Sequence, residues 1–182
     1  MANAAEEQKP VVASSEEPVD DNDDNDWKVR RDQEKAFGDN AFRARDFDTA
    51  IHHYTAALSL DPENHIILSN RSAAYLSSHQ KSKALHDAQD CVKYAPPEYS
   101  KGHSRLAAAL QSLGRHEQAK KAWEKVLKLD PNNQAAKKGL DISNEILKAQ
   151  KAKEEEEKQK DNTATSVNDV GGESDDLDDF FN

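Results

Sequence analysis

The middle of the chain contains the segment Ala50-Ile-His-His-Tyr-Thr-Ala-Ala-Leu-Ser-Leu-Asp-Pro62. Residues 84–96 and 119–131 resemble this segment at offsets of 34 and 35 residues, and the extra residue lies in the stretch that begins at Pro96. A constant period of this length indicates an internal structural repeat. The equivalent positions are Gly38, Ser72 and Ala107; Ala50, Ala84 and Ala119; Tyr54, Ala88 and Trp123; Ala57, Cys91 and Val126; and Pro62, Pro96 and Pro131.

Each repeat unit is predicted to form two helices. Small residues recur where two helices must cross closely, and a proline follows the second helix at the point where it must end. The turn Asp61-Pro-Glu-Asn64 returns as Asp130-Pro-Asn-Asn133, which supports the same division. The predicted helices span residues 27–45, 47–60, 66–77, 80–94, 99–113 and 116–129.

A further helix over residues 135–159 is expected to cover the last repeat, because stacked units of this kind cannot bury their apolar faces singly. Its apolar face is supplied by Leu140, Ile142, Ile146 and Leu147. The predicted fold is all-α, with three helix-turn-helix repeats in residues 27–133 and a capping helix in 134–160 that continues into a charged, solvated helix. The three repeats cover about residues 31–64, 65–99 and 100–133.

The two ends of the chain differ in charge from its middle. Residues 27–160 carry 24 Lys and Arg against 19 Asp and Glu, whereas the whole chain of 182 residues has a net charge of −10. Residues 1–26 and 161–182 are strongly acidic and contain few large apolar side chains, so both are expected to be disordered tails. Leu177, Phe180 and Phe181 stand among acidic residues, a composition found in short docking segments as well as in frayed termini.

The sequence argues against several classes of function. No apolar run approaches the roughly 18 residues that span a bilayer, and no secretion signal is visible, so we expect a cytoplasmic protein, with the nucleus as the alternative, and no membrane partner. Cys91 falls at a packing position and is expected to be a buried structural thiol. The adjacent His52 and His53 diverge on a helix and lack partners for a metal site. We expect no enzyme activity, no cofactor and no nucleic-acid partner, and we assume a monomer.

The pattern of small residues, aromatic residues and prolines resembles the tetratricopeptide repeat over residues 31–133 and the capping helix. Within that family, Ser69-Asn-Arg-Ser-Ala-Ala-Tyr75 and Lys101-Gly-His-Ser-Arg-Leu-Ala-Ala-Ala-Leu110 are similar to the co-chaperones that link the seventy- and ninety-kilodalton heat-shock proteins. The resemblance implies a right-handed superhelix and a carboxylate clamp. In such a clamp two Lys, two Asn and an Arg grip the C-terminal Glu-Glu-Val-Asp of a chaperone.

Four of the five clamp positions match in this chain. They are Lys35, Asn70, Lys101 and Arg105, while Asp39 stands where the family pattern has its first Asn. An ionised carboxylate at this position accepts hydrogen bonds and cannot donate them, and it faces a negatively charged ligand. An ion pair with Lys35, one helical turn away, would mute the repulsion but would divert Lys35 from the ligand. We therefore expect Asp39 to weaken the clamp.

The residues themselves also indicate an anion site. Lys101 and Arg105 are four residues apart on one predicted helix, as are Lys35 and Asp39 on another, so each pair shares a face. First helices of stacked repeats line a concave surface, where these cations would converge around Asn70. The expected function is therefore a non-enzymatic adaptor that captures an acidic peptide by its C-terminal end.

Two alternatives remain open at the level of the sequence. The same groove would also suit a scaffold that recognises another protein or an internal peptide, independently of a free C-terminus. The acidic tails would in a third scheme fold back onto the basic middle of the chain and compete with the ligand.

Overall fold

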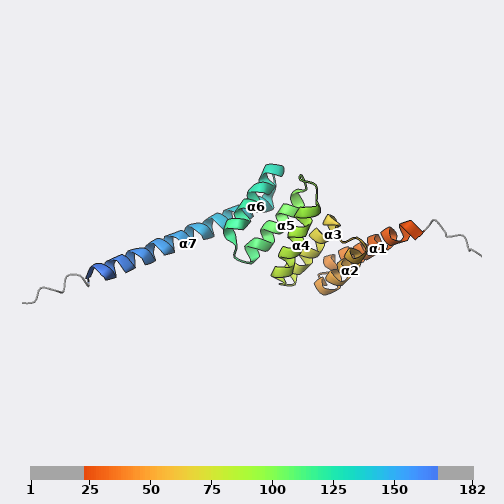
Figure 1. The fold of residues 1–182 in the computed structure, drawn as a ribbon, viewed down its shortest axis with the longest axis horizontal. Coiled ribbons are helices and arrows are strands. Elements are labelled where there is room, and N and C mark those ends of the chain that lie inside the picture. The colour runs from red at the N-terminus through yellow and green to blue at the C-terminus, as the bar shows by residue number, and fades with distance from the viewer. Residues whose placement is uncertain (1–22, 168–182) are drawn as a thin grey trace, which may run out of the picture.

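The computed structural model describes residues 23–167 and is built of seven α-helices in that part of the chain. The helices are α1 (Asp23–Arg43), α2 (Phe47–Leu60), α3 (His65–Ser77), α4 (Lys81–Tyr94), α5 (Ser100–Ser112), α6 (His116–Leu129) and α7 (Gln134–Val167). Helices α1 to α6 form three successive hairpins, and α7 packs on the last of them before running away from the stack (Figure 1). The prediction of an all-α repeat fold is confirmed.

The first helices of the hairpins form one layer and the second helices form another. Helix α3 contacts both α1 and α5, and α5 also contacts α7. Within residues 23–167, α2 does not contact α4, and α4 does not contact α6. The first helices are therefore crowded together while the second helices are splayed apart, which curves the stack and places the first helices on its inner side.

The turns inside the three hairpins share one backbone geometry. Arg45, His79 and Gly114 occupy the same repeat position and have positive φ angles of 65°, 60° and 73°. In each turn the following residue donates its backbone N–H to a carbonyl five residues earlier, a pattern that ends many helices. These bonds run from Asp46 to Ala41 (3.0 Å), from Gln80 to Tyr75 (2.8 Å) and from Arg115 to Leu110 (2.9 Å).

The two Asp-Pro turns between hairpins are also alike. The Asn64 side chain accepts a hydrogen bond from the Ile67 N–H (3.1 Å) and donates one to Asp61 (2.9 Å). Asn133 caps α7 in the same way, with bonds of 3.0 Å from the Ala136 N–H and 3.1 Å to Asp130. A capping side chain satisfies one of the free N–H groups at a helix start, so each Asn fixes where the next helix begins.

Close crossings of the helices depend on small residues, as the repeat pattern predicts. A Cβ atom added to Gly38 on α1 would lie 2.7 Å from the ring of Tyr54 on α2, so only a glycine lets the two helices approach. Gly139 on α7 faces the ring of Trp123 in the same manner. Tyr54 and Trp123, which occupy the same position in the first and third repeats, thus each pack against a glycine of a neighbouring helix.

Two helix limits differ from the prediction by more than two residues. Helix α1 begins at Asp23, where residue 27 was expected, because the exposed carboxylate of Asp26 in its first turn interacts favourably with the helix dipole. Helix α7 continues to Val167, beyond the expected end at residue 159, since residues 148–160 consist of strong helix formers. Residues 23–26 and 161–167, which were expected to belong to the disordered tails, are helical. The rest of both tails, with the motif of Leu177, Phe180 and Phe181, lies outside the described residues.

Candidate functional site

The inner side of the stack carries a cavity of about 250 Å³ between α1, α3 and α5. All three helices contribute side chains to its wall, and α2 adds one aromatic ring. The lining residues are Asp39, Phe42, Arg43, Tyr54, Asn70, Ala73, Lys101 and Arg105. Four of the five residues singled out from the sequence therefore meet in one place, and Lys35 stands beside it.

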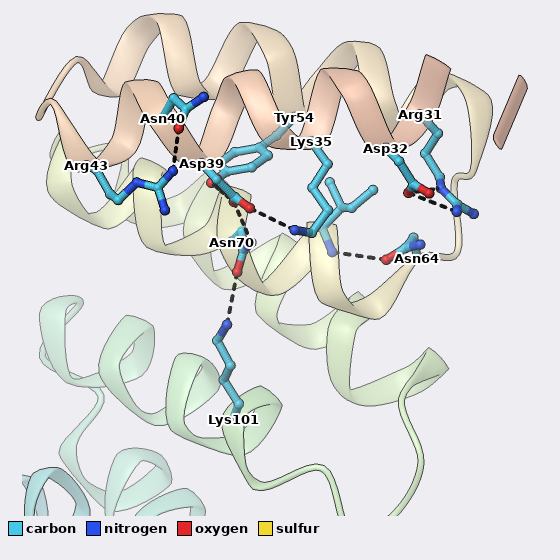
Figure 2. Close-up of polar contacts among 11 residues, drawn as sticks. Arg31, Asp32, Lys35, Asp39, Asn40, Arg43, Tyr54, Asn64, Asn70 and Lys101 are labelled. Atoms are coloured by element: carbon cyan, nitrogen blue, oxygen red, sulfur yellow. Dashed lines mark hydrogen bonds and ion pairs between the residues drawn. The ribbon is translucent and has the colours of Figure 1, made fainter. Parts of the chain in front are cut away.

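Asp39 is the centre of the polar network at this cavity. Its Oδ2 accepts a hydrogen bond from Lys35 Nζ at 2.7 Å, and its Oδ1 accepts bonds from the Tyr54 hydroxyl (2.7 Å) and from Asn70 Nδ2 (3.0 Å). Figure 2 shows the carboxylate lying between these groups. The expected ion pair between Lys35 and Asp39 is present, so the Lys35 ammonium is engaged by the protein itself.

The charge of Asp39 is stabilised by its donors. Burial raises the pKa of Asp39, but the hydrogen bonds from Lys35, Tyr54 and Asn70 outweigh it and leave the pKa below its ordinary value. Burial and the contact with Asp39 raise the pKa of Tyr54, so the phenol keeps its proton and remains a donor. The carboxylate is therefore ionised at neutral pH.

Asn70 continues the network from α1 to α5. Its Nδ2 donates to Asp39 and its Oδ1 accepts a hydrogen bond of 3.0 Å from Lys101 Nζ, as Figure 2 shows. The donor side of the amide therefore points to Asp39 and not into the open cavity. Asn70 thus orients Lys101 across the cavity.

Lys101 and Arg105 form the cationic wall of the cavity. Burial lowers the pKa of both side chains, and the Arg105 charge lowers that of Lys101 further. The Nε of Arg105 is buried and has no hydrogen-bond partner among the described residues. Crowded and partly desolvated cations of this kind are stabilised by an anion, so this wall is suited to a carboxylate.

The helix that carries Asn70 is anchored by its next residue. Arg71 makes a two-pronged ion pair with Asp87 of α4, at 2.7 and 2.8 Å, and donates to Thr55 of α2 at 3.1 Å. The Asp87 side chain is only 3% exposed. This arrangement joins three helices behind the cavity and fixes the rotation of α3 that presents Asn70.

Four lining residues, Phe42, Arg43, Tyr54 and Ala73, were not identified as site residues from the sequence. Tyr54 was noted only for its repeat position, and its hydroxyl donates a hydrogen bond to Asp39. Arg43 was not singled out either, although its position four residues after Asp39 places both on one face of a helix.

Cys91, expected to be a buried structural thiol, is fully buried, and burial raises its pKa to about 11.

The described residues hold no group of three potential metal ligands and no helix that is long and apolar enough to cross a membrane.

Comparison with known proteins relates the chain to one family. Two family models described as tetratricopeptide repeat match residues 35–97 and 100–133. The heat shock protein STI1 of Saccharomyces cerevisiae is 43% identical over 122 residues, which cover 66% of this chain and 20% of that protein. The chain therefore matches about a fifth of the length of this relative.

Two solved structures extend the comparison to three dimensions. The first repeat domain of Spaghetti (RPAP3), bound to the HSP90 peptide SRMEEVD, has a TM-score of 0.63 and 33% identity and covers 65% of this chain and 94% of its own. The second repeat domain of human RPAP3, in complex with the HSP70 peptide SGPTIEEVD, has a TM-score of 0.61 and 29% identity, with coverages of 65% and 98%. The repeat pattern, the stacked hairpins and these matches agree, and the chain belongs to the tetratricopeptide repeat family.

Proposed function

We propose that this chain is a non-enzymatic co-chaperone adaptor whose inner groove binds the acidic C-terminal peptide of cytosolic heat-shock chaperones. The observation that carries the proposal is the convergence of Lys101, Arg105 and Asn70 on one cavity of about 250 Å³. The similar domains solved with peptides that end in Glu-Glu-Val-Asp support the choice of ligand.

The chemistry of the cavity fits the end of such a peptide. A C-terminal Asp carries two carboxylates close together, and charge-assisted hydrogen bonds to ammonium and guanidinium groups are roughly twice as strong as neutral ones. Phe42 and Ala73 add apolar surface for the preceding side chain. Binding is thus expected to capture an extended peptide by its end, without a chemical reaction.

The test is a titration with a peptide ending in Glu-Glu-Val-Asp, in its free-acid and amidated forms. We expect the free acid to bind and the amidated form to lose most of the affinity. The double variant Lys101→Ala, Arg105→Ala is expected to lose binding as well. A matched control is Lys121→Ala, Lys125→Ala, which removes two exposed cations at the same spacing from α6, a second helix.

One observation keeps a second function in view. Lys35 and Asn70 already donate hydrogen bonds to Asp39. These two donors, which a terminal carboxylate would use, are therefore partly occupied by the protein's own carboxylate. A scaffold that reads an internal peptide or a different protein would bind the free-acid and amidated forms equally. Equal affinities, or a failure of the free acid to bind, would overturn the proposed capture of a C-terminus.

A further inference from the structure

Arg43 lies one helical turn after Asp39 and lines the same cavity as Lys101 and Arg105. Its guanidinium hydrogen-bonds the Asn40 side chain on its own helix (Figure 2). The positive charge of Arg43 also acts on Tyr54. Burial and Asp39 raise the pKa of Tyr54, and the charges of Arg43 and Arg105 both oppose that rise. Arg43 on α1 and Arg105 on α5 thus line, from different helices, the cavity that Tyr54 also lines.

Lys35 and Arg43 differ in how much of their charge is available. The Lys35 ammonium is 2.7 Å from the Asp39 carboxylate and does not line the cavity. Arg43, in contrast, forms no ion pair within residues 23–167 and is held only by a neutral amide. A cation that is hydrogen-bonded to a neutral group loses less interaction energy on binding a ligand than a cation that is paired with a carboxylate.

The charges that face the cavity add up to a cationic site in spite of Asp39. Arg43, Lys101 and Arg105 contribute three positive charges, and the one carboxylate among the lining residues is already neutralised by Lys35. A planar guanidinium binds a carboxylate through two parallel hydrogen bonds, which a lysine ammonium cannot do. The two arginines of the cavity thus match in number the two carboxylates of a C-terminal Asp.

We propose that Arg43 replaces Lys35 as the cation that receives the terminal carboxylate of the peptide, so that the working site of this chain is Arg43, Lys101 and Arg105. The inference rests on the proposed function and specifies its site. The pair of Lys35 and Asp39 then forms a neutral wall of the groove. The binding energy comes from Arg43, Lys101 and Arg105.

The experiment compares two variants by titration with the Glu-Glu-Val-Asp peptide. Arg43→Ala is expected to weaken binding about tenfold, because it removes a bidentate carboxylate contact. It should also reduce the ratio between free-acid and amidated affinities, which a purely structural change would leave intact. Arg30→Ala removes an exposed arginine elsewhere on α1 and is the matched control.

The second variant, Lys35→Gln with Asp39→Asn, removes the internal ion pair without changing the net charge. Affinity within threefold of the unchanged chain, or tighter, is expected. If this variant loses tenfold while Arg43→Ala binds normally, Lys35 is the receiving cation, and the inference is wrong while the proposed function stands. If the unchanged chain does not distinguish free acid from amide, the proposed function itself fails, and the assignment of Arg43 fails with it.

Discussion

Asp39 and Asn70, which lie 31 residues apart on α1 and α3, are joined by a hydrogen bond of 3.0 Å from the Asn70 amide to the Asp39 carboxylate. The same amide accepts a hydrogen bond from Lys101, so one side chain connects the first helices of all three repeats. The Asp39 carboxylate thereby orients the polar side chains of the groove, in the region where a peptide would bring its own negative charge.

Replacing this carboxylate with an amide is predicted to strengthen peptide binding. Asp39→Asn removes a negative charge next to the ligand and releases the Lys35 ammonium, so we expect the dissociation constant to fall several-fold, on the order of 1 kcal/mol. Isothermal titration with the Glu-Glu-Val-Asp peptide measures the change. Asp32→Asn removes the same charge from an exposed position on α1 and serves as control. Equal or weaker binding by Asp39→Asn would contradict this interpretation.

The same substitution is predicted to cost stability at neutral pH. Asp39 accepts three hydrogen bonds, and its partial exposure to water limits their net contribution to about 1 kcal/mol. Since the pKa of Asp39 is lowered on folding, its contribution is present above the unfolded value of 3.8 and is lost as the pH falls through the folded value. Urea unfolding of both forms should show a gap at pH 7 that closes below about pH 4; a gap that persists in acid would refute the role of the ionised carboxylate.

The repeated turn geometry yields a prediction about backbone strain. Gly114 has a positive φ and no atom within 4 Å of an added Cβ, so Gly114→Ala should lower the free energy of unfolding by about 1 kcal/mol through the backbone alone. His79 has the same conformation in the second repeat, and His79→Gly should be neutral or stabilising. Thermal unfolding of the two variants provides the comparison, and a shift of both melting temperatures in the same direction would count against it.

The ion pair behind the groove is predicted to be strongly coupled. Arg71→Ala leaves the carboxylate of Asp87 buried without its cation, which costs about 3 kcal/mol. The double variant Arg71→Ala, Asp87→Ala removes that unpaired charge, so it should be less destabilised than the sum of the single variants. A double-mutant cycle from urea unfolding gives the coupling energy. Additive losses would show that the two side chains act independently.

Deletion of residues 161–182 is predicted to leave peptide affinity unchanged. At 1.5 Å per residue, α7 carries residue 160 about 20 Å beyond Leu147, in the direction away from the stack (Figure 1). Titration of the shortened chain tests the scheme in which the acidic C-terminal tail competes with the ligand. An increase in affinity after the deletion would establish that competition.

Much of the fold followed from the sequence because the repeat supplies the same evidence three times. The limits of α2 and α6 were predicted to the residue, since a capping turn and an Asp-Pro turn bracket them. The outer ends of α1 and α7 were not, because a helix end in solvent can shift by several residues at small energetic cost. The family pattern identified the clamp residues by their positions in the repeat. The role proposed for Arg43 could not be predicted in this way, because it depends on the ion pair between Lys35 and Asp39, which only the structure shows.

Helix α7 has a mechanical consequence of its own. It is 34 residues long, about 50 Å, and residues 148–160 are exposed along their whole length. A protein that bound near residue 160 would therefore lie about 20 Å beyond Leu147, clear of the groove and of any peptide within it.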